Sequence, residues 1–396
     1  MGLPTALLLA KADYLVNGYD IDKNKIEQLQ NNQLPFQEKG LQDLFNQSKQ
    51  NFHPSKKLKP SDAFIITVPT PLTTQKNCDL SYAIKATESL KPVLQDNNLI
   101  ILESTVPPGT TLNTVKPILD ETNKTYFLSY VSEKAIPGNT IYEMQHNHRI
   151  IGGINKKSAQ LTKKIYSSFV KAPIHLTDTT TAESVKLIEN TYRDVNIALA
   201  NELSLRLQKL NINPWEAIKL ANHHPRVNIH HPGPGVGGHC IPIDPWFLSN
   251  NDTKLINQSR KMNDSMPSRL LDKITPFLQH QPKPKITIFG VAYKGNIDDT
   301  RESPAIPFIK QAEKQNITIS IYDPHIKRFT YPLHTLNEST KDSDCIIVLT
   351  DHDSFKEINP EEITNMRTKQ IIDTRNILDK SKWENAGFSY YLLFNF

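Results

Sequence analysis

Short apolar runs recur through the first part of the chain, with polar stretches between them. Runs that predict β-strands lie at 13–19, 63–68, 99–102 and 126–131. The spacing of Ile26 and Leu29 among polar neighbours predicts a helix over 23–32. Strands that alternate with helices favour a parallel sheet with helices on both faces.

A different pattern begins at Thr180. The residues from 180 to about 210 contain neither proline nor glycine, which predicts one helix about 45 Å long. Thr180 and Glu183 have the spacing of a capping box at its start. Further helices are predicted at 215–222 and 264–279, so this part of the chain is expected to be helical.

The α/β alternation resumes after the Pro-rich segment 281–284, with predicted strands at 285–290, 317–322, 345–349 and 370–373. We therefore expect an α/β protein with two Rossmann-like lobes, each with a parallel sheet, joined by a long central helix and a helical middle. The expected domains are 1–178, 179–280 and 281–396.

Composition narrows the class of protein. Of the 396 residues, 38% are hydrophobic and 22% charged, which is ordinary for a globular protein. The net charge of +5 is too diffuse to indicate nucleic-acid binding. No apolar run approaches the roughly 20 residues of a membrane span. The three cysteines form no C-x-x-C pair, which favours a reducing, cytoplasmic location.

The strongest chemical signal is the segment 233–248, where four glycines are followed by Cys240 and, four residues later, by Asp244. Glycines let backbone N–H groups approach a ligand, a thiol is a good nucleophile, and a nearby acid can move a proton. The alternative is a tight turn around a structural thiol. Nearby histidines fit no standard zinc spacing, so we expect no metal.

The other candidates for chemistry are less specific. Lys186 and Asn190 are spaced i,i+4 and share one face of the predicted long helix, where they could stabilise an oxyanion or be ordinary surface residues. Cys345 lies in a strand-like run and is expected in the core, and Cys78 lies in a polar loop.

The cysteine segment Gly-Pro-Gly-Val-Gly-Gly-His-Cys-Ile-Pro-Ile-Asp-Pro-Trp-Phe resembles that of the UDP-glucose/GDP-mannose dehydrogenase family. Supporting stretches occur in the family's order at 103–110, 186–198, 221–228 and 296–305. The resemblance implies an NAD-binding lobe, a dimerising helical middle and a UDP-binding lobe. It also implies two successive NAD-dependent oxidations of a nucleotide-sugar C6 hydroxyl to a carboxylate, for cell-surface polysaccharide synthesis. UDP-N-acetyl-D-mannosamine is the favoured substrate, and UDP-N-acetylglucosamine or UDP-glucose the alternative.

The resemblance also assigns roles to residues. Cys240 would form a thiohemiacetal and then a thioester, assisted by the remaining catalytic candidates, Lys186, Asn190, Asp244, Glu133 and Thr105. The cofactor-binding candidates are Gly2, Thr5, Asp20, Thr70, Thr105 and Arg301. The substrate-binding candidates are Arg226, which would act in the neighbouring subunit of a homodimer, Gly237, Lys294 and Arg375.

The chain departs from the family in two places. Ser132 and Lys134 flank Glu133 where the family has proline and arginine. The family's first motif is a strand followed by Gly-x-Gly-x-x-Gly, and Gly2 matches only the third glycine. We therefore expect the N-terminal lobe to lack its first strand and to bind NAD⁺ weakly.

Two other functions stay open at this stage. A single-step hydroxyacid dehydrogenase would also use a Lys-x-x-x-Asn helix but would release one NADH per substrate and have no need of Cys240. A truncated, non-catalytic nucleotide-sugar binding protein would bind UDP without NAD⁺.

Overall fold

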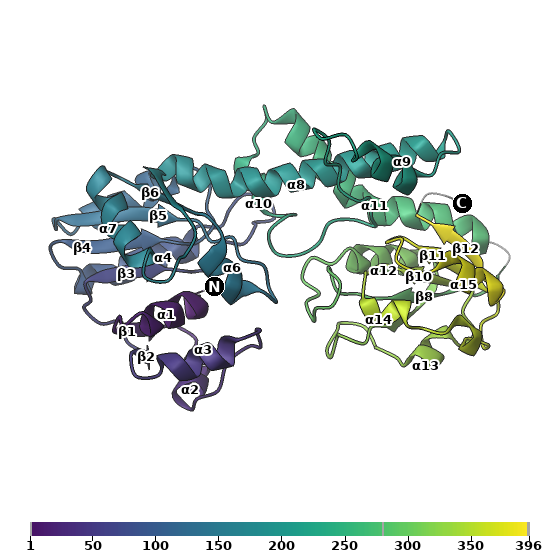
Figure 1. The fold of residues 1–396 in the computed structure, drawn as a ribbon, viewed down its shortest axis with the longest axis horizontal. Helices are drawn as coiled ribbons and strands as arrows, with labels where there is room; N and C mark the ends of the chain where they lie inside the picture. Colours follow the sequence, from purple (N-terminus) through teal and green to yellow (C-terminus); the bar gives the residue numbers. More distant parts are fainter. Residues whose placement is uncertain (1, 279–280, 394–396) are drawn as a thin grey trace. The chain divides into compact units, whose positions relative to one another are not determined.

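The computed structural model describes residues 2–278 and 281–393, which form two compact units. The first runs up to Glu189 and includes Trp246–Leu248, and the second comprises Asn190–Pro245 and the chain from Ser249 on. Both contain a sheet with helices packed on it (Figure 1). The fold is therefore α/β, as the sequence predicted.

The strands of the first unit are β1 (Val16–Tyr19), β2 (Phe52–Ser55), β3 (Ala63–Ile66), β4 (Asn98–Leu102), β5 (Tyr126–Val131), β6 (Arg149–Gly153) and β7 (Ile174–Asp178). Its helices are α1 (Gly2–Lys11), α2 (Lys23–Gln30), α3 (Leu41–Ser48), α4 (Ser81–Leu90), η1 (Lys91–Val93), η2 (Thr111–Val115), α5 (Lys116–Asp120), α6 (Thr140–His146) and α7 (Lys156–Tyr166).

The strands of this unit form two sheets. One has the order β3-β4-β5-β6-β7 and is parallel except between β5 and β6, which run antiparallel. The other is the parallel pair β1 and β2. Within the described residues β1 pairs only with β2, and β3 only with β4. The expected parallel sheet therefore carries one antiparallel step.

Alternate residues of β4 face opposite cores, which is why this strand is a continuous apolar run. Leu99 and Ile101 pack in the cluster that contains residues of α1, α3 and α7. Ile100 and Leu102 pack in the cluster on the other face, with Leu90 of α4. Burial on both faces fits the position of β4 as an interior strand, paired with β3 on one side and β5 on the other.

The long helix α8 spans Thr179–Gln208, close to the predicted 180–210. The predicted capping box is wrong: Asp178 accepts the Thr181 backbone N–H at 2.8 Å and the Thr181 hydroxyl at 2.6 Å. Glu183 instead accepts the backbone N–H groups of Gly109 (2.5 Å) and Thr111 (2.8 Å). Because the Glu183 carboxylate accepts hydrogen bonds from the segment 109–111, it does not cap the start of α8. The spacing of residues in the sequence does not show which of the two partners it has.

The remaining elements are the helices α9 (Pro214–Ala221), α10 (Asp244–Leu248), α11 (Lys254–Leu278), α12 (Ala305–Lys314), α13 (Leu336–Thr340), α14 (Asp353–Lys356), η3 (Pro360–Glu362) and α15 (Lys380–Asn385), and the strands β8 (Lys285–Phe289), β9 (Thr318–Tyr322), β10 (Cys345–Val348), β11 (Gln370–Asp373) and β12 (Ser389–Leu392). Helix α11 begins ten residues before the predicted 264. The strands β2, β6, β7 and β12 were not predicted.

The sheet of the second unit is parallel and has the order β12-β11-β10-β8-β9. Strands β8 and β10 are neighbours in the middle of this order. The chain continues from β8 to β9 on one side and from β10 to β11 on the other side. In such sheets the loops after the two diverging strands separate and leave a ligand crevice at their carboxyl ends. The loop 290–303 after β8 and the segment 349–352 after β10 occupy this position.

Candidate active site

Cys240 lies at the end of the glycine-rich loop and is exposed. Its carbonyl accepts the backbone N–H of Ile243 at 3.0 Å and that of Asp244 at 2.8 Å, which closes a turn into α10. Asp244, the first residue of α10, is only 3% exposed. The loop thus presents the thiol outward and places the carboxylate one turn further along, as its sequence suggested.

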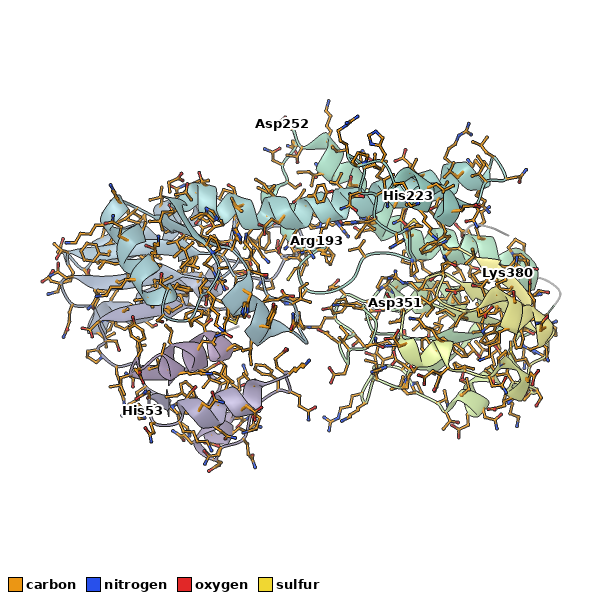
Figure 2. All side chains as sticks on the ribbon, in the orientation of Figure 1. His53, Arg193, His223, Asp252, Asp351 and Lys380 are labelled. Carbon is orange, nitrogen blue, oxygen red and sulfur yellow. The ribbon has the colours of Figure 1, made fainter. Side chains whose placement is uncertain are left out.

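Asp244 is tied to the long helix. The Asn190 side-chain amide donates to its Oδ2 at 2.5 Å. The guanidinium of Arg193, a residue labelled in Figure 2, donates to the side-chain oxygen Oδ1 of Asn190. These two contacts fix which way the Asn190 amide points, with its N–H₂ toward Asp244. Arg193 was not predicted, although its i+3 position from Asn190 puts both on one helix face.

The glycines of the loop allow close packing on the segment after β8. A Cβ on Gly237 would lie 2.7 Å from the backbone oxygen of Glu302. Gly238 has φ +91°, and a Cβ there would lie 2.7 Å from the Tyr293 ring. Its N–H donates to the Arg301 carbonyl at 3.1 Å. Gly237, a predicted substrate-site residue, is therefore a packing position against the loop 290–303.

Arg301 and Cys240 lie within electrostatic reach of each other. The pKa of Arg301 is raised, chiefly by its hydrogen bond to Asp299 and to a smaller extent by the nearby Cys240. The guanidinium contacts both Asp299 oxygens, at 2.6–3.1 Å. Partial burial and the charge of Arg301 lower the pKa of His239. Arg301, paired with Asp299, and the neighbouring His239 are thus the charged and titratable groups described around the thiol.

A second cation lies at the carboxyl end of the sheet. Arg375 donates to Asp351 Oδ2 at 3.2 Å, and the other oxygen of Asp351 accepts the Gly295 N–H at 3.0 Å. Burial would raise the pKa of Asp351, but Arg375 and these hydrogen bonds hold it below its ordinary value. A Cβ on Gly233 would lie 2.7 Å from the Arg375 guanidinium. Lys294, next to Gly295, is exposed.

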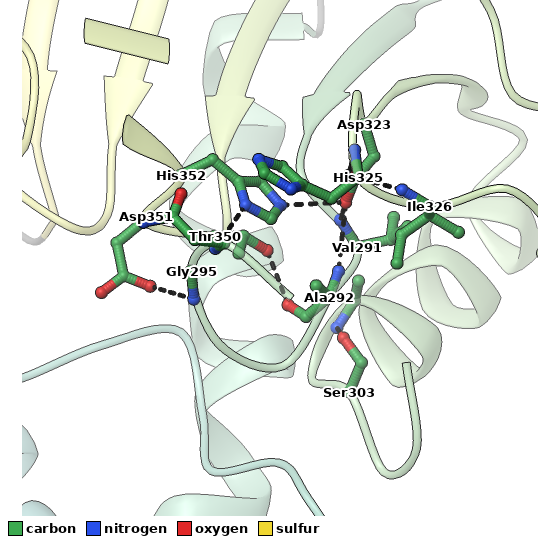
Figure 3. A network of polar contacts seen from close by, with 12 residues as sticks. Val291, Ala292, Gly295, Ser303, Asp323, His325, Ile326, Thr350, Asp351 and His352 are labelled. Atoms are coloured by element: carbon green, nitrogen blue, oxygen red, sulfur yellow. Dashed lines mark hydrogen bonds and ion pairs between the residues drawn. The ribbon is translucent and has the colours of Figure 1, made fainter. Parts of the chain in front are cut away.

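The loop that carries Lys294 and Arg301 is held by a buried polar network (Figure 3). Asp323 follows β9 and accepts the N–H groups of Val291 (2.7 Å), Ala292 (3.2 Å), His325 (2.9 Å) and Ile326 (3.2 Å). His352 Nε2 lies 3.2 Å from Asp323 Oδ2, and its Nδ1 accepts the Asn296 N–H at 2.8 Å. His352 thus bridges Asp323 and the Asn296 backbone, and the two side chains together fix both ends of the segment 291–296.

In the first unit, two predicted residues meet at the carboxyl ends of β3 and β4. The Thr70 hydroxyl donates to the Thr105 carbonyl at 2.6 Å. A Cβ on Gly2 would lie 2.3 Å from the Thr67 hydroxyl oxygen, so α1 can start this close to the end of β3 only with glycine there. Asp20 follows β1 and accepts the Asp22 N–H at 2.9 Å through one oxygen.

These positions fit a dinucleotide. Gly2 lets the first turn of α1 approach the end of β3, and the N-terminus of a helix is a common place for a phosphate. An acidic residue directly after the next strand suits the ribose hydroxyls. Thr5, also predicted to bind the cofactor, is buried and its hydroxyl donates to Glu103 at 3.1 Å. Its side chain thus points into the interior of the unit.

Glu133 has an arginine partner that comes from elsewhere in the chain. Arg149 of β6 donates to Glu133 Oε2 at 2.9 Å, and Glu133 Oε1 accepts the N–H groups of Lys134 (2.6 Å) and Ala135 (2.7 Å). Lys134 forms an ion pair with Glu189. Glu133 thus has an arginine partner from β6, sixteen residues further along the chain, which the sequence did not reveal.

Two predicted residues lie apart from these contacts. Lys186 on α8 is 7% exposed. Arg226 is exposed, and its backbone N–H and guanidinium lie 3.3–3.4 Å from the ring of His224. Cys345 is fully buried in β10, as predicted, and burial raises its pKa.

Residues 2–278 and 281–393 contain neither a cluster of metal-ligand side chains nor a helix able to span a membrane. No group of three or more His, Cys, Asp or Glu side chains in this part of the chain is placed to hold a metal ion. None of the helices described there combines the length and apolar character needed to cross a bilayer.

The α/β architecture of both units and the exposed Cys240 in a glycine-rich loop, with Asp244 one turn away, are typical of an α/β nucleotide-binding dehydrogenase with a nucleophilic cysteine. Comparisons with known proteins agree. Residues 1–170 match the NAD binding domain of the UDP-glucose/GDP-mannose dehydrogenase family, 180–265 its central domain and 287–380 its UDP binding domain. The chain belongs to this family and is an NAD-dependent enzyme of its type.

Relatives match along the whole chain. A UDP-N-acetyl-D-mannosamine dehydrogenase of Methanococcus maripaludis is 47% identical, over 100% of this chain and 95% of its own length. The solved structure of the UDP-D-ManNAc dehydrogenase from Pyrococcus horikoshii is 39% identical, with a TM-score of 0.93 over 100% of this chain and 97% of that one. The Staphylococcus aureus UDP-N-acetyl-mannosamine dehydrogenase is also 39% identical, with a TM-score of 0.89 over 99% and 95%.

Proposed function

We propose that this enzyme oxidises the C6 hydroxyl of UDP-N-acetyl-D-mannosamine to a carboxylate in two NAD-dependent steps, in the cytoplasm, where a reducing environment keeps the Cys240 thiol active. The observation that carries the proposal is the exposed Cys240 with Asp244 one turn away, in a chain 47% identical over its full length to a dehydrogenase named for that sugar. A single two-electron oxidation would need no such thiol.

The roles follow from the chemistry of each side chain. The Cys240 thiolate adds to the C6 aldehyde carbon and gives a thiohemiacetal. Loss of hydride from that carbon to NAD⁺ would leave a thioester, which water cleaves to the carboxylate and the free thiolate. Lys186 and Asn190 stabilise the oxyanion at C6. Glu133 accepts the proton of the attacking water, Thr105 orients that water, and Asp244 assists proton transfer.

The proposed cofactor residues are Gly2, Thr5, Asp20, Thr70, Thr105 and Arg301. The chemistry that NAD⁺ supplies when bound is the acceptance of hydride, one in each oxidation. Gly2 and Thr5 lie in the first turn of α1, whose positive dipole end suits a phosphate. Lys294, Arg375 and Gly237 are the proposed UDP-sugar residues in the second unit, because two cations beside a close-packed backbone suit a diphosphate.

The test of the proposed function is product stoichiometry. The purified chain is given limiting UDP-N-acetyl-D-mannosamine, UDP-N-acetylglucosamine or UDP-glucose with excess NAD⁺, and NADH and uronate are counted. We expect two NADH per uronate and the highest kcat/KM with the mannosamine sugar. One NADH per substrate would indicate a single-step dehydrogenase, and UDP binding without turnover would indicate a non-catalytic protein.

Replacing Asp244 tests the contact between the loop and the long helix. In Asp244→Asn an amide would face the Asn190 amide in place of the carboxylate, so both proton transfer and the pose of Asn190 suffer. We expect kcat to fall about 10²- to 10³-fold, with a UDP dissociation constant close to that of the parent. Asp272→Asn, an exposed change on α11, is the control. Unchanged kcat in Asp244→Asn would contradict the assignment.

We also propose a homodimer that uses the apolar face of α8. Ile188, Tyr192 and Leu199 lie on one helix face by their spacing and are 56%, 54% and 48% exposed. Exposed apolar side chains aligned on one helix indicate a helix-to-helix interface, and the occupant we propose is a second copy of this chain. Arg226 would then act in the partner's site.

Charged residues on that face should separate the two copies. We expect the parent to scatter light as a dimer at micromolar concentration and Ile188→Glu/Leu199→Glu to scatter as a 45.0 kDa monomer. The control is Leu255→Glu, at a 69% exposed position on α11, which should remain dimeric. A monomeric parent would contradict the dimer and the role of Arg226.

A further inference from the structure

A chain of buried polar side chains joins the helices α8 and α11 to Gly233, the first glycine of the glycine-rich loop. Asn201 of α8 is fully buried, and its side-chain oxygen accepts the Gly233 backbone N–H at 2.9 Å. Its side-chain amide donates to Oδ1 of Asn263, on α11, at 3.0 Å. Asn201 therefore contacts the loop through its oxygen and α11 through its nitrogen.

A buried ion pair fixes the direction of this chain. The Asn263 amide donates to Asp194 Oδ1 at 2.8 Å and to the Asp194 backbone carbonyl at 2.9 Å. Arg260 of α11 donates to the same carboxylate oxygen at 2.5 Å. Because a carboxylate only accepts, the Asn263 nitrogen must face Asp194 and its oxygen must face the Asn201 nitrogen. The Asn201 oxygen is thereby directed at Gly233.

Stability alone does not account for these groups. Within residues 2–278 and 281–393, Asp194 Oδ2 and Arg260 Nε are buried with no hydrogen-bond partner. A buried ion pair with unsatisfied atoms often contributes less to stability than apolar side chains of similar volume would. What the network does provide is one defined position for the Gly233 backbone.

The other side of Gly233 faces the guanidinium of Arg375. A Cβ on Gly233 would lie 2.7 Å from Arg375 Nη1, so a larger residue there would displace the guanidinium. Arg375 Nη2 donates to Asp351 Oδ2 at 3.2 Å. The guanidinium thus lies between the Gly233 backbone and the Asp351 carboxylate, and its position depends on where the loop backbone is held.

We propose that Asn201 is a positioning residue for nucleotide binding. It fixes the Gly233 backbone, and Gly233 in turn fixes the guanidinium of Arg375 for the diphosphate of the UDP-sugar. This inference rests on the proposed role of Arg375 in binding that diphosphate. It adds a residue on the long helix that acts on the ligand only through the loop.

Hydrogen exchange in the full-length chain tests the first contact and needs no ligand. Asn201→Leu keeps a side chain of similar size but cannot accept the Gly233 N–H, so we expect that amide to exchange at least about 10-fold faster. The control is Ser204→Ala, one turn further along α8. Ser204 is also fully buried, but its hydroxyl donates within the helix, to the Ala200 carbonyl at 2.9 Å, and its loss should leave Gly233 exchange unchanged.

Calorimetry with UDP tests the second contact and needs no turnover. We expect Asn201→Leu to bind UDP about 10-fold more weakly than the parent, the loss of roughly one charge-assisted hydrogen bond, with NAD⁺ affinity unchanged. Gly233→Ala keeps the N–H for Asn201 but places a methyl group where the guanidinium lies. It should weaken UDP binding to a similar extent without faster exchange.

Two results would overturn the proposal. One is Gly233 exchange in Asn201→Leu at the parental rate. The other is a lowered Tm in Asn201→Leu with the UDP affinity of the parent, which a purely structural role would give. If Asn201→Leu does not fold, Gly233→Ala decides, and parental UDP affinity in that variant would overturn the link to Arg375. A parent that binds no UDP would instead reject the proposed function, and Gly233 exchange alone would then decide whether Asn201 fixes the loop.

Discussion

Cys240→Ser should form no detectable uronate while it binds UDP-sugar about as tightly as the parent. The serine hydroxyl is ionised far less than a thiol at neutral pH and does not hold the aldehyde as a thioester-forming adduct. Cys240 is exposed and lies within electrostatic reach of Arg301. The serine variant should therefore fold like the parent and lose only the ability to form uronate. Uronate is measured by mass spectrometry, and UDP-sugar affinity by calorimetry.

The matched control is Cys78→Ser, which removes another thiol that lies in the polar loop between β3 and α4. It should keep the NADH stoichiometry of the parent. Uronate formation by Cys240→Ser at close to the parental rate would show that the acyl intermediate is not attached to this residue, and the two-step thioester route would be wrong.

Asp323→Ala should destabilise the second unit by about 3–5 kcal/mol, because it leaves several buried donors without their acceptor. Four backbone N–H groups and His352 converge on this carboxylate (Figure 3). The backbone amides of the segment 291–296, which carries Lys294, should be the first to lose protection from hydrogen exchange. Urea unfolding with hydrogen exchange of that segment measures the effect, and KM for the UDP-sugar should rise with it.

The pH dependence gives a second test of Asp323. Burial raises its pKa, but the hydrogen bond from His352 and the backbone N–H groups outweigh this and lower the pKa below the ordinary 3.8. A lowered pKa contributes stability above the unfolded-state value that is lost as the pH falls through the folded-state value. The stability gap between parent and Asp323→Ala should therefore narrow in acid below about pH 4.

The control for Asp323→Ala is Asp252→Ala, at an exposed position in the same unit that Figure 2 labels. It should change the free energy of unfolding by less than about 0.5 kcal/mol. If Asp323→Ala unfolded at the same urea concentration as the parent, with unchanged exchange at 291–296, the network would not be what holds the loop.

The parts of the fold that could be predicted are those whose signal is local. Strand β4 is a continuous apolar run because both of its faces are buried, and α8 lacks proline and glycine along its length. The strands that were not predicted lack such a signal. β2 contains Pro54, and β6 ends in Gly152 and Gly153, where a Cβ would lie 2.4–2.5 Å from backbone atoms of neighbouring segments.

The sequence alone determined the chemistry: a thiol in a glycine loop, an acid four residues later, and a lysine and asparagine on one helix face. These depend on residue type and on spacings of a few residues, which backbone geometry converts directly into proximity. Tertiary structure decided the partners. Glu183 matched a capping box but accepts hydrogen bonds from Gly109 and Thr111. Arg149, sixteen residues beyond Glu133, is the arginine that pairs with it. The contact between Asn201 and Gly233 depends on α8 meeting the glycine-rich loop across 32 residues of chain, and no local pattern encodes that contact.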